Sequence, residues 1–300
     1  MSIQEASKLI RAGRLVAFPT ETVYGLGANA LDAAAVLWIF AAKGRPSTSP
    51  LIVHVDSIEM AKEFAAEWPA AAQILAEHHW PGPLTLVLPK RDIIPDEVTA
   101  GLPNVGLRMP AHPMALALIR AAGVPIAAPS ANRFAGISPT TAEHVRRSLG
   151  DAVDMILDGG STPVGIESTV LSLAGAKPVL LRPGMVTREE IEELIGPVLI
   201  AGEPAAGAHP SPGMHARHYS PATPLMVVRG GLLPHAGRGA YLQHGVSMPA
   251  DPIGYAAALY ATLHRLDVQK LDWIAVEEPP DEPRWAGIRD RLRRASTPEG

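Results

Sequence analysis

The sequence predicts an α/β protein, and three observations carry that prediction. Short apolar runs alternate with helical patterns from the amino terminus to about Gly184, which is typical of a sheet covered by helices. Several of the helical patterns begin with capping signals. A stretch rich in Pro, Gly and Ala at residues 202–223 then precedes a shorter α/β pattern. We therefore expect a mixed sheet in residues 1–201, a linker at 202–223 and a small α/β domain at 224–300.

The strands of this sheet are predicted from short runs of branched apolar side chains. In chain order they are Leu15–Phe18, Leu51–Val55, Leu84–Leu88, Val105–Arg108, Ile126–Ala128, Met155–Leu157, Val170–Leu173 and Val179–Leu181. Two more runs, at 225–228 and 273–276, lie beyond the linker. Several gaps between the runs are long enough for a helix, as crossovers in an α/β sheet require.

The helices are predicted from their first residues. The Ser/Thr-x-x-Glu spacing of a capping box occurs at Ser2 with Glu5, at Thr140 with Glu143, and at Thr187 with Glu190. Asp32 can cap a further helix, which runs to Lys43 and is ended by Gly44. These signals fix where the polypeptide turns from strand to helix.

Two helices are expected beyond the linker. Tyr255, Leu259, Leu263 and Leu266 recur at helical spacing and form one apolar face. The last helix carries Arg289, Arg291, Arg293 and Arg294. We expect these arginines to form a solvated face, with a nucleic-acid patch as the alternative.

Composition excludes several classes of function. The chain has 300 residues, of which 47% are apolar, and it has a net charge of −4, so no global basic field attracts nucleic acid. It has no cysteine, which excludes disulfides, thiolate metal sites and a cysteine nucleophile. Neither a signal peptide nor an apolar run of membrane-spanning length is found. We expect a cytoplasmic protein that does not enter a membrane.

The segment Lys43–His54 places two cations and several hydroxyls between a helix and a strand. Arg45 precedes a proline, which favours an extended backbone, and residues two apart in an extended backbone point the same way. Lys43 and Arg45 can then face one target, and a point charge beside a planar fork of donors suits a polyphosphate. The alternative is a solvated helix end whose cations complement the helix dipole.

A dinucleotide-binding site is the first alternative to weigh. Residues 25–30 match the G-x-G-x-x-A pattern. That fingerprint requires the first glycine directly after a strand and an acidic residue about twenty positions later. Here residues 19–24 intervene, and the later position holds Lys43 and Arg45. This fingerprint therefore does not explain the cations. The P-loop pattern G-x-x-x-x-G-K-[ST] does not occur in the chain, so a standard P-loop does not explain them either.

Polar side chains follow several predicted strands, where α/β sheets commonly bind ligands. Ser130 and Asn132 come two apart after a buried strand and can donate to phosphate oxygens, although such a segment is also typical of a turn. Arg108 at a strand end can grip a carboxylate or form a structural ion pair. His54 in an apolar strand is also consistent with a satisfied core histidine, and His218 lacks the neighbouring carboxylates that a zinc site would need.

The order of these motifs closely resembles the YrdC-like family of L-threonylcarbamoyladenylate synthases, in its two-domain form. The matching segments are residues 18–27, 43–46, 50–54, 80–85, 105–110, 128–132, 167–169 and 181–184, followed by 212–221 in the linker. The resemblance implies a twisted open mixed sheet and a small Rossmann-like second domain, here shorter than is usual. It also implies that the linker closes over the nucleotide as a lid.

The resemblance implies that the chain joins ATP, L-threonine and bicarbonate or CO₂ into threonylcarbamoyl-AMP and diphosphate. The product would pass to a threonylcarbamoyl-transferase complex, which modifies the adenosine next to the anticodon in ANN-decoding tRNAs. Mg²⁺ would accompany ATP, but no carboxylate cluster marks a protein-ligated metal site. Weak contact with tRNA is a further expectation.

The resemblance also assigns roles to residues. The catalytic, phosphate-binding set is Lys43, Arg45, Ser130 and Asn132. Positions for ATP add Ser49, Ser138, Arg182, His218 and Tyr219. Positions for L-threonine are Thr22, His54, Arg108, Ala128 and Ser168. Two alternatives stay open: an RNA-binding module without adenylation activity, and a hydrolase or transferase acting on other carbamoyl-adenylates.

Overall fold

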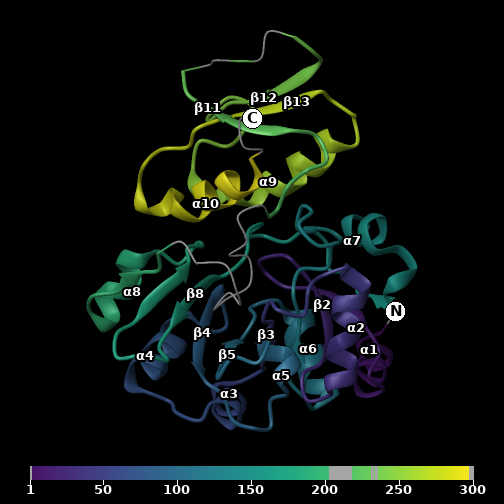
Figure 1. The fold of residues 1–300 in the computed structure, drawn as a ribbon, viewed down its shortest axis with the longest axis vertical. Coiled ribbons are helices and arrows are strands. Elements are labelled where there is room, and N and C mark those ends of the chain that lie inside the picture. The colour runs from purple at the N-terminus through teal and green to yellow at the C-terminus, as the bar shows by residue number, and fades with distance from the viewer. Residues whose placement is uncertain (1, 203–217, 231–232, 234–235, 297–300) are drawn as a thin grey trace.

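The computed structural model describes residues 2–202, 218–230, 233 and 236–296 (Figure 1). The predicted lid falls mainly on residues 203–217, outside the described residues. The larger part of the molecule is built on a mixed sheet, and a smaller part with three further strands lies above it in Figure 1. The α/β class predicted from the sequence is confirmed.

The large sheet contains ten strands among the described residues. In spatial order they are β10 (Leu199–Ile200), β9 (Val179–Arg182), β8 (Thr169–Ser172), β4 (Leu84–Pro89), β5 (Asn104–Arg108), β3 (Ile52–His54), β6 (Ile126–Ala127), β2 (Tyr24–Asn29), β1 (Val16–Pro19) and β7 (Met155–Ile156). Some neighbours, such as β3 and β5, are parallel, and others, such as β4 and β5, are antiparallel. The sheet is therefore mixed, as expected.

Helices cover both faces of this sheet. They are α1 (Ile3–Arg11), α2 (Ala33–Lys43), α3 (Ile58–Phe64), α4 (Ala70–His79), α5 (Asp96–Thr99), α6 (Pro113–Ala122), α7 (Ala142–Leu149) and α8 (Arg188–Ile195), with a 3₁₀ turn at Gly150–Ala152. In β1, Val16 and Phe18 pack in one cluster with α1 and α6, whereas Ala17 packs in another with α2 and α7. This alternation is the period of two that a strand imposes.

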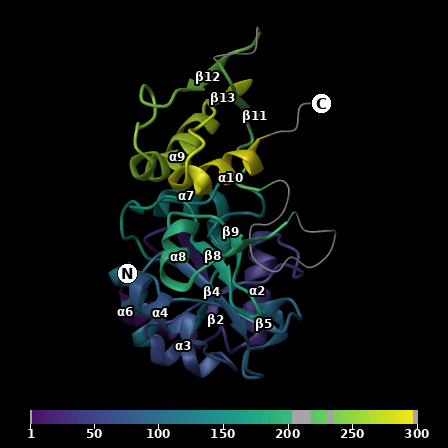
Figure 2. The ribbon, with the colours of Figure 1, turned by 90° about the vertical axis from the view of Figure 1, so that its left-hand side faces the viewer.

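The smaller part is a parallel sheet in the order β11 (Leu225–Val228), β13 (Trp273–Glu277) and β12 (Gly239–Leu242). Its helices are α9 (Pro252–Asp267) and α10 (Ala286–Ala295), preceded by a 3₁₀ turn at Pro283–Trp285. Figures 1 and 2 show both helices lying between this sheet and the larger part. Parallel strands with helices on the sheet are what a small Rossmann-like domain requires.

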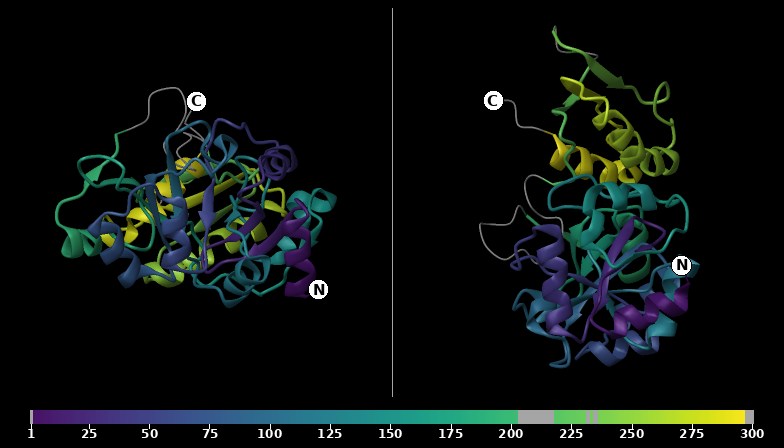
Figure 3. Two further views of the ribbon diagram at one scale, coloured as in Figure 1. Left: turned by 90° about the horizontal axis from the view of Figure 1, so that it is seen from below. Right: turned by 90° about the vertical axis from the view of Figure 1, so that its right-hand side faces the viewer.

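The two parts share one hydrophobic cluster. Val23, Ile137 and Ile166 of the larger part pack in the same buried cluster as residues of α9 and α10. The backbones also approach closely, because a Cβ added at Gly287 would lie 2.9 Å from the Cα of Gly184. Such a separation leaves room for glycine only. The right-hand view in Figure 3 shows the two parts stacked along the long axis of the molecule.

The structure corrects three details of the sequence prediction. Ser2 and Thr187 open helices with complete capping boxes, as predicted. The helix α7, however, is capped by Thr141 rather than by the predicted Thr140. The Thr141 hydroxyl accepts a hydrogen bond from the backbone amide of His144. The glycine-rich residues 24–29 form the strand β2, which the sequence analysis did not predict. The last helix does not have a uniformly solvated arginine face, since the side chain of Arg291 is fully buried.

Candidate active site

A small cavity of about 50 Å³ lies where several strands of the large sheet end. Among its lining residues are ten of the predicted site residues: Thr22, Arg45, His54, Arg108, Ala128, Ser130, Ser168, Arg182, His218 and Tyr219. A larger cavity of about 940 Å³ between β9, α8 and α10 contains none of them, and its arginines are ion-paired on an open surface. We place the functional site in the small cavity, because buried charged side chains gather there.

The register of the sheet brings distant residues to this cavity. His54 and Arg108 are partners across the parallel strands β3 and β5, so both lie at the same sheet edge. Ser130 follows β6 and forms an isolated bridge with Gly25 of β2. Arg182 ends β9 beside Ser168, which precedes β8. The prediction that polar residues at strand ends share one site is thus consistent with where the structure places them.

Arg45 is a buried cation held by neutral acceptors. One of its terminal nitrogens donates to Ser49 Oγ at 2.8 Å and to the carbonyl oxygen of Pro50 at 3.0 Å, and its Nε has no hydrogen-bond partner among the described residues. Burial, followed by repulsion from Arg182, lowers the pKa of Arg45 to about 10. The guanidinium therefore stays charged at neutral pH, and an anionic ligand would compensate its charge.

Lys43 lies behind the cavity and supports the loop that borders it. Its ammonium group donates to the carbonyl oxygens of Ser130 and Asn132. Burial and the charge of Arg45 hold the pKa of Lys43 well below its usual value. The Ser130 hydroxyl donates to Asn132 Oδ1 at 2.5 Å, and the Asn132 amide nitrogen donates to the carbonyl oxygens of Arg133 and Gly136. Lys43 and Asn132 thus fix the shape of this loop.

Two further predicted residues, Ser49 and Ser138, form hydrogen bonds with residues that line the cavity. Ser49 accepts from Arg45, and the Ser138 hydroxyl donates to Glu167 Oε1 at 2.5 Å. Consequently, Lys43, Ser49, Asn132 and Ser138 do not line the cavity themselves, but each is one hydrogen bond away from a residue that does.

Arg108 is one of the predicted threonine positions. This side chain is ion-paired with Glu21 at 2.7 Å, and it donates to Thr22 Oγ1 at 2.9 Å and to the carbonyl oxygen of Gly82. Arg108 therefore forms the structural ion pair that was one of the two predicted alternatives, and it also lines the cavity. Next to it, His54 packs edge-on against Phe18, and burial, followed by the charge of Arg108, lowers the pKa of His54 to about 3. His54 is neutral at physiological pH.

The opposite wall is formed by Ser168 and Arg182. The Arg182 guanidinium donates to the carbonyl oxygen and the hydroxyl of Ser168, and that hydroxyl is 2.8 Å from Thr85 Oγ1. Burial is the largest influence on Arg182 and lowers its pKa. Arg182 and Arg45 thus provide two buried cations on one cavity, a suitable environment for several phosphate oxygens.

His218 and Tyr219 close the cavity from the described end of the linker. Tyr219 is 1% exposed and has a φ of 63°, a left-handed conformation that is costly for a tyrosine. Its ring stacks on Tyr260 of α9, and its hydroxyl has no hydrogen-bond partner among the described residues. A strained, buried tyrosine with an unpaired hydroxyl at a cavity is typical of a ligand-binding position.

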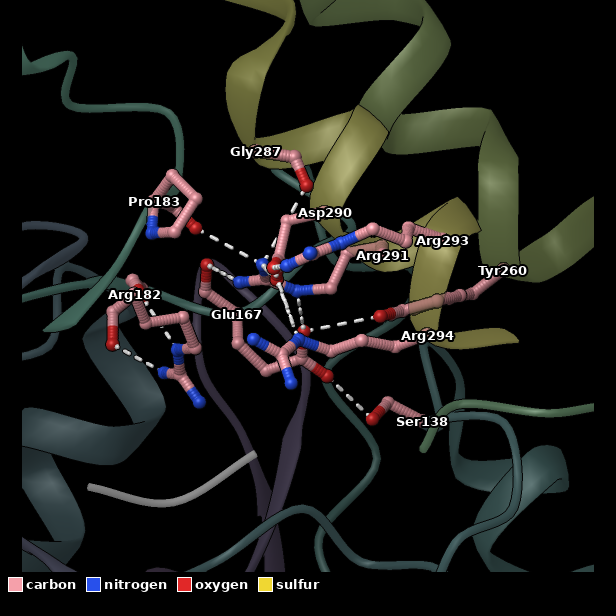
Figure 4. Close-up of polar contacts among 11 residues, drawn as sticks. Ser138, Glu167, Arg182, Pro183, Tyr260, Gly287, Asp290, Arg291, Arg293 and Arg294 are labelled. Atoms are coloured by element: carbon pink, nitrogen blue, oxygen red, sulfur yellow. Dashed lines mark hydrogen bonds and ion pairs between the residues drawn. The ribbon is translucent and has the colours of Figure 1, made fainter. Parts of the chain in front are cut away.

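Sequence reasoning missed four residues around the cavity. Glu21 and Glu167 lie within segments that the sequence analysis singled out. Their neighbours Thr22 and Ser168 were assigned roles there, but the two glutamates were not. Arg291 and Tyr260 bond to Glu167 from α10 and α9 (Figure 4). No local pattern signalled them, because their partner is about a hundred residues away.

Fold and cavity together define an α/β protein with a buried site lined by cationic side chains. A comparison with protein families agrees: the model of the Sua5/YciO/YrdC family, described as telomere recombination, matches residues 8–184. The model of the threonylcarbamoyl-AMP synthase C-terminal domain matches residues 186–297. The chain belongs to the Sua5/YciO/YrdC family.

Individual relatives match over nearly the whole chain. A threonylcarbamoyl-AMP synthase of Bacillus subtilis is 44% identical over 98% of this chain and 92% of its own, and one of Pyrococcus abyssi is 43% identical over 98% and 94%. The structure of Pyrococcus abyssi Sua5 complexed with L-threonine is 41% identical, has a TM-score of 0.91, and covers 98% of this chain and 94% of its own. Escherichia coli YciO, at 24% identity and a TM-score of 0.54 over 61% of this chain and 88% of its own, shares the fold.

Proposed function

We propose that the chain is an L-threonylcarbamoyladenylate synthase, which converts L-threonine, bicarbonate or CO₂ and ATP into threonylcarbamoyl-AMP and diphosphate. The observation that carries this proposal is the buried set of Arg45, Arg108 and Arg182 on one cavity, with Lys43 directly behind it. The relatives described above bear the synthase name, and one of their structures contains L-threonine.

The chemistry that we propose requires no protein nucleophile. The neutral threonine amine adds to CO₂ and releases a proton to solvent, which gives a carbamate, and a carbamate oxygen then attacks the α-phosphorus of ATP. The bond from that phosphorus to the β-phosphate bridging oxygen breaks, and diphosphate leaves with the electron pair. Catalysis then consists of positioning the reactants and stabilising charge on the phosphoryl oxygens. The absence of cysteine is compatible with this chemistry.

Each side of the cavity would hold one reactant. Arg45 and Arg182 would bind the phosphates, and the loop carrying Ser130 would supply further donors. Arg108, together with Thr22, would bind the threonine carboxylate. His54, neutral and apolar on its Phe18 side, would shape the threonine side-chain position.

Mg²⁺ is proposed to enter as part of the ATP complex. Glu21 and Glu167 are each ion-paired with an arginine, so neither offers a free carboxylate. The described residues contain no group of three or more acidic or histidine side chains arranged to hold a metal ion. The ion would supply charge neutralisation on the phosphates.

The proposal extends to a place in tRNA modification. We propose that the product is consumed by a threonylcarbamoyl-transferase complex that modifies the adenosine next to the anticodon in ANN-decoding tRNAs, with at most weak contact between this chain and tRNA. The net charge of −4 provides no global basic field for nucleic acid, which disfavours the RNA-binding alternative. Within the described residues, no helix combines the length and hydropathy needed to span a bilayer.

The experiment that tests the proposal is diphosphate release from ATP, with L-threonine and bicarbonate supplied together and each omitted in turn. Release that depends on both supports the synthase. Diphosphate release without threonine, or no release while ATP still binds, would contradict it. In that case salt-dependent titration with tRNA would test the RNA-binding alternative.

A further inference from the structure

A buried ion pair connects α10 to the wall of the cavity. Arg291 Nε lies 2.7 Å from Glu167 Oε2, and the two side chains are 0% and 9% exposed. Glu167 also accepts from Tyr260 of α9 at 3.0 Å and from Ser138 at 2.5 Å (Figure 4). The carboxylate thus joins both C-terminal helices to the loop of the larger part that carries Ser138.

The backbone contacts of Arg291 are equally specific. Its terminal nitrogens donate to the carbonyl oxygen of Pro183 at 3.0 Å and to that of Glu167 at 3.1 Å. Pro183 directly follows Arg182, and Glu167 directly precedes Ser168. Because Arg182 and Ser168 bond to each other at the cavity, Arg291 fixes the two residues that flank this pair.

Arg291 also supports Tyr219. Its guanidinium carbon lies 5.3 Å from the centre of the Tyr219 ring, within the range of a cation–π contact. Tyr219 has a left-handed backbone, which persists only where surrounding structure holds it. A single side chain of the C-terminal domain therefore contacts both the Glu167 wall and the tyrosine that closes the cavity.

On the basis of the proposed function, we propose that Arg291 is a positioning residue: through it the C-terminal domain sets the geometry of Glu167, Ser168, Arg182 and Tyr219 for adenylate formation. Stability alone does not explain such a pair, because a buried ion pair often contributes little net stability compared with apolar packing. What the pair provides here is a fixed orientation for groups that line the cavity.

The charges around Glu167 make this proposal testable by pH. Burial raises the pKa of this carboxyl, but Arg291, Arg182 and the Ser138 hydroxyl outweigh burial and hold it below its ordinary value. The other ionisable groups near it are Tyr219 and Tyr260, whose pKa values are raised chiefly by burial, and Asp290, which is paired with Arg291 and Arg294. Loss of Arg291 removes the strongest influence that keeps Glu167 ionised.

The test compares Arg291→Met with Arg289→Met, a matched control on the same helix whose ion pair with Asp281 is solvent-exposed. We expect Arg291→Met to lower kcat about 10²-fold at pH 7, the size of effect produced by misplaced reacting groups. Its activity should recover as the pH rises and Glu167 ionises. The double variant Glu167→Gln/Arg291→Met should lose this pH-dependent recovery, while Arg289→Met should behave as the parent protein. A pH profile parallel to that of the parent would overturn the proposal.

Two further measurements keep the proposal testable if Arg291→Met does not fold or if the parent protein is inactive. Tyr260→Phe removes only one donor to Glu167 and is expected to fold. It should move the acid limb of the kcat–pH profile to higher pH, as Arg291→Met does, but by a smaller amount. An unmoved acid limb would overturn the proposal. If the parent protein releases no diphosphate, the proposed function fails by itself. The positioning role is then judged by calorimetry with ATP: weaker binding in Arg291→Met than in Arg289→Met supports it, and equal binding overturns it.

Discussion

The ammonium nitrogen of Lys43 lies 2.6 Å from the carbonyl oxygen of Ser130, across 87 residues of sequence. A buried lysine is thus used to hold a loop whose hydroxyl lines the cavity. The contact explains why a cation at the end of α2 and a Ser-Ala-Asn turn belong to one site. It also separates two roles that the sequence could not separate, namely supporting the loop that borders the cavity and lining the cavity itself.

Replacing Lys43 with Met should reduce both stability and turnover. The carbonyl oxygens of Ser130 and Asn132 would lose their donor, at a cost of about 2 kcal/mol in the free energy of unfolding. Urea unfolding and diphosphate release check the two effects. Lys8→Met, an exposed lysine in the last turn of α1, is the control and should change neither. Near-normal turnover in Lys43→Met would remove Lys43 from the site.

Replacing Arg45 with Ala should reduce kcat/KM for ATP by about 10²–10³-fold, the range typical of losing one preorganised donor to a transition state. Arg45→Lys should restore only a small part of this activity, because lysine carries all its donors on one nitrogen. It cannot place one donor at Ser49 and Pro50 and another at the position of Nε, which lacks a partner among the described residues. Steady-state kinetics with varied ATP measures the effect. Full activity in Arg45→Lys would show that charge alone is required.

Arg108→Lys should raise the KM for L-threonine much more than the KM for ATP. The planar guanidinium serves Glu21, Thr22 and Gly82 at once, and a lysine cannot reproduce that geometry. The control is Arg14→Lys, whose ion pair with Asp154 is exposed. An equal rise in both KM values would argue that Arg108 maintains the fold and does not recognise threonine.

Tyr219→Phe should stabilise the protein and weaken its binding of ATP. The hydroxyl is buried without a partner, so its removal should raise the free energy of unfolding by about 1 kcal/mol. Tyr255→Phe is a matched control, because its hydroxyl is also buried and unpaired but lies in the C-terminal core, away from the cavity. Both variants should gain stability, and only the first should raise the Kd for ATP. Unchanged ATP binding in Tyr219→Phe would contradict the assignment.

The protein should lose stability as the pH falls below about 6.5, the ordinary pKa of histidine. The pKa of His54 is about 3 in the folded protein, so in this window the unfolded chain binds a proton that the folded protein does not. The free energy of unfolding therefore decreases with decreasing pH, and His54 contributes up to about 1.4 kcal/mol per pH unit. Urea unfolding at several pH values should show a shallower decrease in His54→Gln, and an identical slope would exclude His54 as a source.

Much of the fold could be predicted because its signals are local. Asp32 caps α2 and Gly44 ends it in a left-handed conformation, as the sequence indicated. The strand β2 was missed because Gly25 and Gly27 weaken a strand pattern. The structure shows why Gly27 is there, since a Cβ at this position would lie 2.6 Å from the Phe18 ring. A glycine required by its neighbours cannot be distinguished from a glycine of a loop without those neighbours.

The site could be predicted only in part, for a similar reason. Arg108 was located at a strand end from the strand pattern, and the structure does end β5 at this residue. The close spacing of several arginines in α10 predicts a solvated face that includes Arg291. What distinguishes it is the Glu167 carboxylate, 124 residues earlier in the chain. A buried charge is recognised by its partner, and the sequence of one helix does not contain that partner.

The shared hydrophobic cluster has a consequence for synthesis on the ribosome. Val23, Ile137 and Ile166 are made first, but the residues that cover them, including Trp285 and Ile288, are made near the end. Until then the nascent chain exposes this apolar surface, and nascent apolar surface is prone to wrong association. The same final residues complete the support of Glu167. Assembly of the site therefore waits for the last turns of the polypeptide, and a chain that stops early should lack both its cover and its catalytic geometry.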